Sequence, residues 1–284
     1  MTVVYKHDLL DALTRLGLEP GGTVIFHSSL KSLGHVVGGA DTVIDAFLET
    51  VDADGKHPTG TVLVPTLIQK DFMNAYRTWS LDKPSDVGYI TEVFRHRPGA
   101  LRSDQATHSV AAIGRRAAEM TADHGKSGKR WGVFGDTPYA VASPWQKLHD
   151  SPSTVVLIGV DMSRNTCKHL LEYQLINDTV AAVPDEDTRT ALRARIMDYD
   201  PAARTFLREG RIWPFYPSSV LEPTARELGL LHETVCGDAR LMAFDPSDVT
   251  NLARRLFDEM PEHMCTPEFR QWLALHEVTH RMQF

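Results

Sequence analysis

The sequence predicts a mixed α/β (α+β) protein in which helices flank a central twisted sheet. Short β-branched and apolar runs alternate along the chain with segments whose apolar residues recur at helical spacing. The clearest strand is STVVLIGVD at residues 153–161, and a sheet built from such alternating elements should have both faces covered by helices. No repeat, low-complexity tract or Pro/Ser-rich hinge divides the 284 residues. We therefore expect a single domain over residues 1–284.

The first two thirds of the chain contain most of the expected elements. Leucines at helical spacing predict a helix over residues 6–18, which EPGG at residues 19–22 ends. The strand TVIFHSSL (residues 23–30) then opens into a polar turn. The elements expected after it are a helix at 38–51, a strand at 59–67, a short helix at 88–99, a strand at 108–114, a helix at 115–125, the strand at 153–161 and a helix at 165–175.

The remainder of the chain begins with a charged region. Residues 178–210 are helical in pattern and lack a sharp linker on either side, so we expect a helical insertion of the same domain there. ETVCGDARLMAF (233–244) predicts one or two strands, and DPSDVTNLARRLFDEM (245–260) predicts a capped helix. A last helix should begin at residues 266–268 and dock through its apolar face.

Composition excludes several classes of protein. A net charge of −7 disfavours nucleic acid as a partner and mildly favours a cationic one. No apolar run approaches a membrane span, and the first residues lack the apolar stretch of a signal peptide. Cys167, Cys236 and Cys265 form no C-x-x-C pair, which favours a reducing compartment. We expect a cytoplasmic protein that binds neither membrane nor nucleic acid.

The pattern HEVTH at residues 276–280 raises the possibility of a zinc peptidase. On a helix His276 and His280 share one face, and Glu277 could act as general base. The usual zinc peptidases of this type take a third ligand from well downstream, whereas only residues 281–284 follow here. So short a pattern often arises by chance, and we expect no metal. The zinc peptidase is kept as a distant alternative.

Two other stretches hold more chemistry. A strand end delivers His27, Ser28, Ser29 and Lys31 into a loop, and ligand sites in α/β sheets favour the carboxyl ends of strands. His169 and Glu172 are three residues apart on a helix that follows the clearest strand, so an imidazole and a carboxylate share one face. Such a pair can work as an oriented general base. The alternative is a helix-surface pair without a catalytic role, and the pattern alone leaves both open.

FHSSLKSLGHVVGGADTVIDAFLETV (residues 26–51) resembles the opening signature of the aminoglycoside N(3)-acetyltransferases, which use acetyl-coenzyme A and are distinct from the GNAT acyltransferases. The likeness covers about the first two thirds of the chain, and VCGDARLMAFDPSDV (235–249) is a weaker echo. The further blocks, in order, are GTVLVPTL (60–67), VGYITEVFRHRPGALRSDQATHSVAAIGRRA (87–117), SPWQKL (143–148) and VVLIGVDMSRNTCKHLLEYQ (155–174). The resemblance implies an antibiotic N-acetyltransferase-like fold in which acceptor and coenzyme meet in a central cleft.

The resemblance also implies roles for individual residues. The family's N-T-x-x-H-x-x-E block falls on Asn165, Thr166, His169 and Glu172, with His169 as general base. The coenzyme contacts that it implies are His27, Ser28, Ser29, Leu30, Lys31, Gly34, Val36 and Ser109. The family's R-S-x-H-P-x-x-S block, which Ser109 closes, departs from the pattern because Gln105 and Ala106 replace its histidine and proline. His108 is not at the equivalent position, so any role of the block's histidine is in doubt.

The implied reaction moves an acetyl group from acetyl-coenzyme A, the co-substrate, to the 3-amino group of an aminoglycoside, which confers antibiotic resistance. Another amino sugar or a biosynthetic amine is the alternative acceptor, and a protein that only binds coenzyme A is a third possibility. The partner would be a small polycationic molecule, and the protein a monomer or a homodimer. Acidic residues should line the acceptor side, with residues 184–189 and 199–210 as either a lid or solvated surface.

The implied mechanism centres on His169. Histidine is the side chain whose unperturbed pKa lies closest to neutral pH, so it can take a proton from the acceptor ammonium. Glu172 either orients His169 or binds the acceptor, and amides or hydroxyls of the turn 27–29 are candidate donors to the oxyanion. Cys167 suggests an acetyl-cysteine intermediate, but it should point to another face of the helix than His169. We expect direct transfer.

Overall fold

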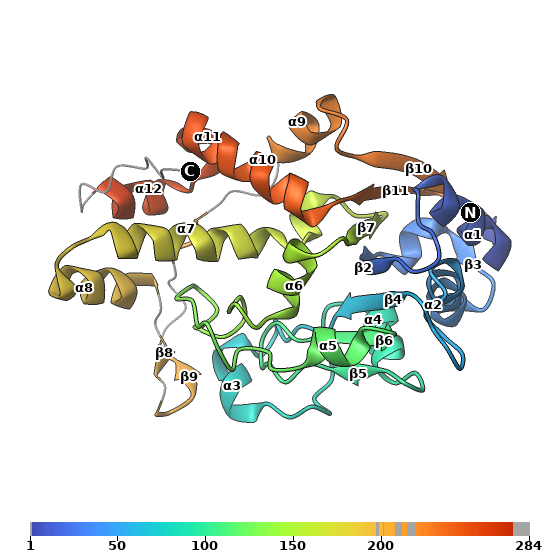
Figure 1. Cartoon of the computed structure of the whole chain (residues 1–284), viewed down its shortest axis with the longest axis horizontal. Helices are drawn as coiled ribbons and strands as arrows, with labels where there is room; N and C mark the ends of the chain where they lie inside the picture. Colours follow the sequence, from blue (N-terminus) through green and yellow to red (C-terminus); the bar gives the residue numbers. More distant parts are fainter. Residues whose placement is uncertain (1, 197–198, 201, 208–211, 215–219, 275–284) are drawn as a thin grey trace.

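The computed structural model describes residues 2–196, 199–200, 202–207, 212–214 and 220–274 (Figure 1). Its centre is a seven-stranded sheet with the strand order β10-β11-β7-β2-β4-β6-β5. The strands in this order are β10 (His232–Cys236), β11 (Ala239–Phe244), β7 (Thr154–Ile158), β2 (Thr23–Ser28), β4 (Thr61–Pro65), β6 (Val110–Gly114) and β5 (Leu101–Arg102). HEVTH lies outside the described residues.

The three strands at the centre of the sheet run parallel. β2 pairs with β7 on one side, in register from Val24↔Thr154 to Ser28↔Ile158. It pairs with β4 on the other side. The outer strands on both sides are antiparallel to their inner neighbours. Because β2 and β7 are parallel neighbours, their carboxyl ends and the loops after them lie at the same edge.

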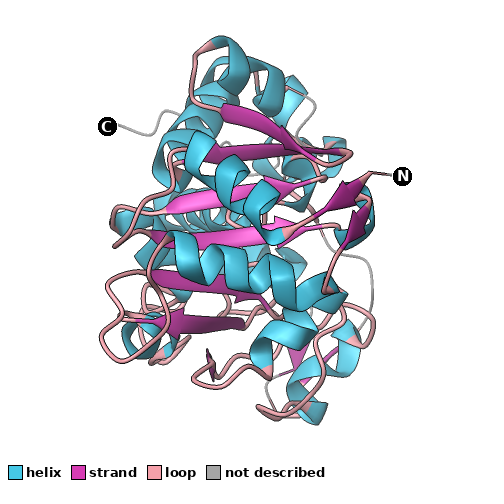
Figure 2. Ribbon diagram, turned by 90° about the vertical axis from the view of Figure 1, so that its right-hand side faces the viewer, coloured by secondary structure: helices cyan, strands magenta, loops and turns pink. Residues whose placement is uncertain are grey.

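Helices cover both faces of the sheet, as Figure 2 shows. Alternate residues of β2 explain the arrangement, since successive side chains of a strand point to opposite faces. Phe26 packs on the face covered by α1 (Lys6–Arg15), α2 (Gly39–Thr50) and α4 (Tyr89–Arg95), and its ring stacks on Phe47 of α2 with centroids 4.1 Å apart. Ile25 belongs to the opposite core. The helices of that face include α5 (Ala117–Thr121), α6 (Pro144–Asp150), α7 (Lys168–Ala182) and α10 (Pro246–Glu259).

The other elements are short or lie around the sheet. They are the parallel pair β1 (Val3–Val4) and β3 (His35–Val36), the hairpin β8 (Tyr199–Asp200) and β9 (Thr205–Phe206), the helices α3 (Ala75–Thr78), α8 (Glu186–Ile196), α9 (Leu221–Glu227), α11 (Pro261–Met264) and α12 (Pro267–Ala274), and the 3₁₀ turns η1 (Leu30–Leu33), η2 (Phe72–Asn74) and η3 (Met162–Arg164). None of the described helices is long and apolar enough to cross a membrane.

The structure confirms the predicted fold class: a mixed α/β architecture with a central sheet flanked by helices. Residues 233–244 form two strands, because Gly237 turns the chain with φ +57° where an added Cβ would lie 2.1 Å from the Leu33 carbonyl oxygen. Within the region 178–210, where we expected a helical insertion, the structure places the end of α7, all of α8 and the β8–β9 hairpin.

Candidate active site

The carboxyl ends of β2 and β7 form the floor of a polar site. The turn after β2 is held against the end of β7, since the Ser29 amide donates to the Ile158 carbonyl (2.9 Å) and the Ser32 hydroxyl to the Gly159 carbonyl (3.1 Å). After β7 the chain forms η3 and enters α7. The sheet therefore brings residues 27–29 beside residues 160–169, at the edge where α/β sheets bind ligands.

A cavity of about 470 Å³ opens at this edge. The side chains predicted from two separate blocks of sequence, His27 with Ser28 and His169, meet in its wall. The residues that line it are His27, Ser28, Pro65, Leu67, Gln69, Asp86, Val87, Gly88, Thr91, Val160, Ser163, Arg164, Asn165, Thr166 and His169. Tertiary structure alone adds the group from 65 to 91, which runs from the last residue of β4 through a loop into the first turn of α4.

His169 and Glu172 form a partly buried hydrogen-bonded pair on the first turns of α7. Nδ1 of His169 lies 2.6 Å from Oε2 of Glu172, and Glu172 is 1% exposed. A carboxylate only accepts hydrogen bonds, so Nδ1 carries the proton and Nε2 keeps its lone pair. Burial contradicts the solvated surface pair that the sequence left open, because a carboxylate is taken out of water only where a partner compensates for it. The pair has the arrangement of an oriented base.

A second cavity, of about 360 Å³, also has His169 in its wall. It is lined by Gln69, Lys70, Phe72, Met73, Phe134, His169 and Trp213. Only His169 and Gln69 line both cavities as described. An imidazole that lines both cavities can serve a reaction between two bound molecules.

His27, the other histidine predicted for the site, is buried and is a poor base. It is 6% exposed, and burial together with the charge of Lys168 lowers its pKa to about 3. Its Nε2 atom has no hydrogen-bond partner among the described residues. An imidazole of such low basicity stays neutral near neutral pH and does not take up a second proton. Of the two histidines predicted for the site, His169 is therefore the one suited to proton transfer.

Cys167 is unsuited to nucleophilic attack. The thiol is 3% exposed, and burial raises its pKa to about 12. The thiolate is the nucleophilic form of cysteine, so a negligible fraction is reactive at neutral pH. This agrees with the expectation of direct transfer.

The other predicted coenzyme residues on and after the β2 turn are not in the lining of the first cavity. The Ser29 hydroxyl accepts a hydrogen bond from the Ser32 hydroxyl (2.8 Å), and Leu30 and Lys31 begin η1. Gly34 has φ +96°, where an added Cβ would lie 2.5 Å from the Thr2 carbonyl oxygen, and Val36 pairs with Val4 in the β1–β3 sheet. None of these five is among the residues that line the cavity.

Ser109 lies behind the cavity wall. It is fully buried, its hydroxyl donates to the Thr66 carbonyl (2.8 Å), and it accepts from Nε of Arg102 (3.2 Å). Thr66 precedes Leu67, which lines the cavity. The structure therefore places Ser109 where it supports the wall.

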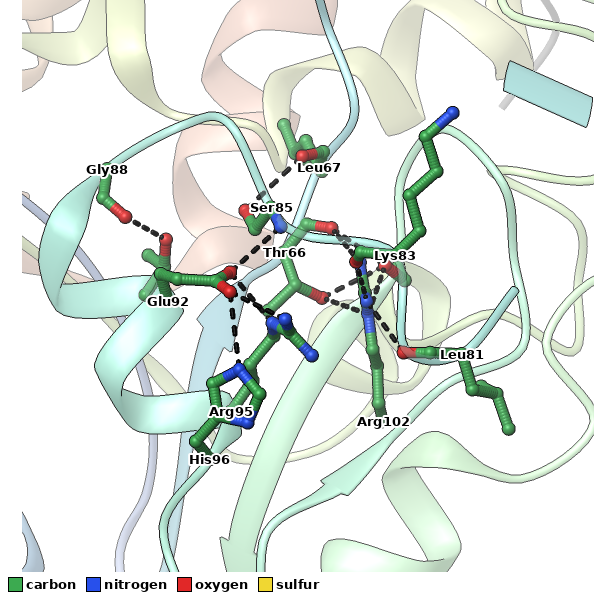
Figure 3. Close-up of polar contacts among 12 residues, drawn as sticks. Thr66, Leu67, Leu81, Lys83, Ser85, Gly88, Glu92, Arg95, His96 and Arg102 are labelled. Carbon is green, nitrogen blue, oxygen red and sulfur yellow. Dashed lines mark hydrogen bonds and ion pairs between the residues drawn. The ribbon is translucent and has the colours of Figure 1, made fainter. Parts of the chain in front are cut away.

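Arg102 and Glu92 tie down the loop that forms one wall of the first cavity (Figure 3). The Arg102 guanidinium donates to the carbonyls of Leu81 (2.8 Å) and Lys83 (2.5 Å), and Glu92 accepts from the Ser85 amide (2.9 Å). Burial lowers the pKa of Arg102 to about 10, so the group is still charged at neutral pH. The loop then presents Asp86, whose carboxylate accepts from the amides of the facing residues 69 and 70.

Gln105, which stands where the family has histidine, supports the second cavity. Its Nε2 donates to the Tyr76 hydroxyl (3.0 Å), and its Oε1 accepts from the amides of Thr107 (2.8 Å) and His108 (2.5 Å). The Tyr76 hydroxyl in turn donates to the carbonyl of Phe134 (2.8 Å), one of the cavity's aromatic walls. Gln105 thus replaces the family's histidine with an amide whose donors and acceptor all form hydrogen bonds.

His108 lies beside His169 but is held neutral. The two ring centroids are 6.1 Å apart. Burial and the neighbouring His169 and His124 lower the pKa of His108 well below its usual range, and its Nδ1 is hydrogen-bonded to the Thr107 hydroxyl (2.9 Å). A neutral ring at this position places no competing charge beside the base.

The acidic run at residues 184–189 lies away from both cavities. Glu186 forms exposed ion pairs with Arg189 and Arg193 at the start of α8. These carboxylates belong to solvated surface, which is one of the two interpretations left open for this segment.

Comparisons with known proteins show the family of the chain. A family model described as aminoglycoside 3-N-acetyltransferase matches residues 25–258. The chain is 30% identical over 191 residues to the SPbeta prophage-derived aminoglycoside N(3')-acetyltransferase-like protein YokD of Bacillus subtilis (strain 168), which is 60% of this chain and 65% of that protein. It is 32% identical over 185 residues to aminoglycoside N(3)-acetyltransferase IX of Micromonospora chalcea, 59% of each chain. The match thus spans less than two thirds of either relative's length.

Solved structures share the fold. The structure of AAC-IIIb in binary complex with CoASH superposes with a TM-score of 0.69 at 19% identity, covering 94% of this chain and 99% of that one. The apoenzyme of aminoglycoside acetyltransferase AAC(3)-IVa superposes with a TM-score of 0.68 at 19% identity, covering 95% and 98%. With a family model that spans most of the sequence, the chain belongs to the aminoglycoside 3-N-acetyltransferase family.

Proposed function

We propose that this protein transfers the acetyl group of acetyl-coenzyme A to an amine of an aminoglycoside, the 3-amino group, and so confers resistance. The observation that carries the proposal is the His169–Glu172 pair, whose imidazole lines two cavities. Family membership supports the reaction type. Another amino sugar or a biosynthetic amine is the alternative acceptor.

His169 acts in this proposal as the general base. The acceptor's ammonium must lose a proton before its nitrogen can attack the thioester, and Nε2 of His169 takes that proton. Glu172 holds the imidazole by its other nitrogen and stabilises the imidazolium as it forms. The amine nitrogen bonds to the carbonyl carbon, the C–S bond of the tetrahedral intermediate breaks, and the leaving thiolate takes up a proton. This assigns Glu172 to orienting the base rather than to binding the acceptor.

The first cavity is proposed to hold the thioester end of the coenzyme. A structure of one relative is a binary complex with CoASH, which supports coenzyme use by this fold. Ser28 at the carboxyl end of β2 can donate to the carbonyl oxygen as charge develops on it. Arg164 provides a guanidinium in the same cavity, suited to an anionic group of the coenzyme. Residues 29–31, Gly34, Val36 and Ser109 remain predicted coenzyme contacts.

Aminoglycosides are proposed as acceptors because relatives of the same fold bind them. Solved structures of relatives contain apramycin, a gentamicin and sisomicin. All three are small polycations, the class of partner expected from the sequence.

We also propose that residues 1–284 act as one cytoplasmic domain. Strands from residues 23–28 and 239–244 share one sheet, which supports a single folding unit that includes residues 178–210. Three free, buried cysteines fit a reducing compartment.

An acceptor screen tests the proposed function. Purified protein is mixed with acetyl-coenzyme A and, separately, gentamicin, apramycin or sisomicin, and thiol release is followed; NMR of the product identifies the acetylated nitrogen. We expect acetylation at the 3-amino group of at least one of them. Absence of acetylation of every amine offered would refute the proposal. Stoichiometric zinc that is lost together with a peptidase activity in His280→Ala would favour the zinc peptidase instead.

A further inference from the structure

We propose that the second cavity admits a primary amine carried on a flat, apolar body with a single positive charge, so that this chain acetylates arylalkylamines as well as amino sugars. The proposal rests on the acetyl transfer at His169 proposed above. It is carried by the cavity's aromatic walls, by their fixed positions and by the charges around them.

Ring side chains make up four of the seven described residues that line the cavity: Phe72, Phe134, His169 and Trp213. Phe134 stands edge to face with Trp213, with centroids 4.9 Å apart at 71°, and edge to face with Phe72 at 5.6 Å and 73°. The His169 ring lies 5.1 Å from Phe134 and 5.9 Å from Trp213. Met73 completes the apolar lining. Such walls offer both faces and edges to a bound ring and attract a cation at their faces.

The walls are held in place before any ligand binds. The backbone of Phe134 is fixed on both sides, because its amide donates to the Tyr173 hydroxyl (2.9 Å) and its carbonyl accepts from the Tyr76 hydroxyl (2.8 Å). Gln105 donates to the same Tyr76 hydroxyl (3.0 Å). Phe72 stacks on Phe206 of the β8–β9 hairpin with centroids 4.6 Å apart. Aromatic walls that are already in place need little ordering when a ligand binds.

The described lining of the cavity can accommodate a single ammonium beside His169. Among its lining residues that the structure describes there is no Asp or Glu, and Lys70 is one of them. Two described carboxylates of the site are engaged: Asp86 accepts from the amides of Gln69 and Lys70, and Glu172 is bonded to His169. A monoamine presents one nitrogen to His169 and leaves its ring to the aromatic walls.

The reaction balances without a further reactant. The free amine nitrogen forms a bond to the thioester carbonyl carbon, the C–S bond breaks, and the electron pair leaves on sulfur. The proton lost by the nitrogen passes to His169, and the coenzyme leaves as its thiol after protonation. The products are one amide and one molecule of coenzyme A.

The test compares amines that differ only in the ring. Initial rates of thiol release from acetyl-coenzyme A are measured with 2-phenylethylamine, with ethylamine and, as the polyamine reference, with gentamicin. Because the ring replaces water against aromatic walls, we expect kcat/KM for 2-phenylethylamine to exceed that for ethylamine by about 10- to 100-fold. Equal values for the two monoamines would overturn the inference, and gentamicin acetylation alongside them would leave the proposed function standing. Failure of all three amines would remove the proposed function and this inference together.

Trp213 variants distinguish recognition by the ring from a general effect. The side chain is 39% exposed, and its backbone carbonyl accepts from the Thr266 hydroxyl, a contact that substitution of the side chain preserves. Trp213→Ala should raise KM for 2-phenylethylamine about tenfold, with KM for acetyl-coenzyme A unchanged, and Trp213→Phe should restore most of the loss. An unchanged amine KM in Trp213→Ala, or an equal rise in the coenzyme KM, would contradict the assignment.

Discussion

Removal of the His169 imidazole should abolish most of the transfer without unfolding the protein. General-base catalysis contributes about 10²–10⁴-fold, so His169→Ala should lower kcat by that factor. The same change strips Glu172, which is 1% exposed, of the partner that lies 2.6 Å away. An unpaired buried acceptor costs about 1–3 kcal/mol of unfolding free energy. At about 2–4 °C per kcal/mol, a fall in Tm of several degrees should accompany the loss of activity.

His169→Asn is the matched control, because it separates these two effects. The asparagine amide nitrogen occupies nearly the place of Nδ1 and can still donate to Glu172, but the side chain has no basic nitrogen. We expect Tm close to that of the wild type together with the same 10²–10⁴-fold loss of kcat as in His169→Ala. The assay is thiol release from acetyl-coenzyme A with a saturating acceptor near neutral pH, with Tm from calorimetry. Wild-type turnover by the folded His169→Asn variant would refute the assignment of the base.

Three further predictions concern the coenzyme, the thiol and the pH dependence of stability. Ser29→Leu should raise KM for acetyl-coenzyme A more than KM for the acceptor; equal changes would show that the turn after β2 is not a coenzyme contact. Cys167→Ala should keep kcat within about twofold, since burial raises the pKa of that thiol to about 12, and a loss near that of His169→Ala would instead indicate an acetyl-cysteine intermediate. Burial lowers the pKa of His124 to about 4, so as pH falls from 6.5 toward 4 the unfolded state gains a proton that the folded state does not. The contribution of His124 to the unfolding free energy should therefore fall by about 1.4 kcal/mol per pH unit. The amide of His124→Gln can still donate to the Pro138 carbonyl. The unfolding free energies of this variant from urea melts at pH 7 and pH 5 should therefore differ by less than those of the wild type. An unchanged difference between the two pH values would assign the pH dependence to other groups.

The Ser109 prediction shows where sequence resemblance and structure carry different information. The motif places this serine near the coenzyme, and its burial between Thr66 and Arg102 shows how it would act there, by supporting the cavity wall. A bulky residue at that position would therefore disturb the fold as well as the coenzyme site. Sequence spacing cannot separate a residue that lines a cavity from one that lies directly behind its wall.

The sequence by itself determined the features that depend on near neighbours in the chain. Helical spacing and β-branched runs predicted the main helices and strands, and the three-residue spacing of His169 and Glu172 predicted their contact, because both residues belong to one helix. The end of β2 was predicted as a ligand site from its polar turn, and the structure places His27 and Ser28 in the cavity wall.

Only the tertiary structure decided which of these local features meet. The order of strands, with β2 between β7 and β4, brings His27 beside His169, and no local pattern encodes that order. The same packing recruits Asp86 and Trp213 from segments without periodicity and lets Gln105 reach Tyr76. Burial is likewise a property of the assembled chain, which is why the weak basicity of His27, the unreactive thiol of Cys167 and the desolvated Glu172 could not be predicted from sequence. Local periodicity sets secondary structure, whereas removal of water from a side chain depends on every element packed against it.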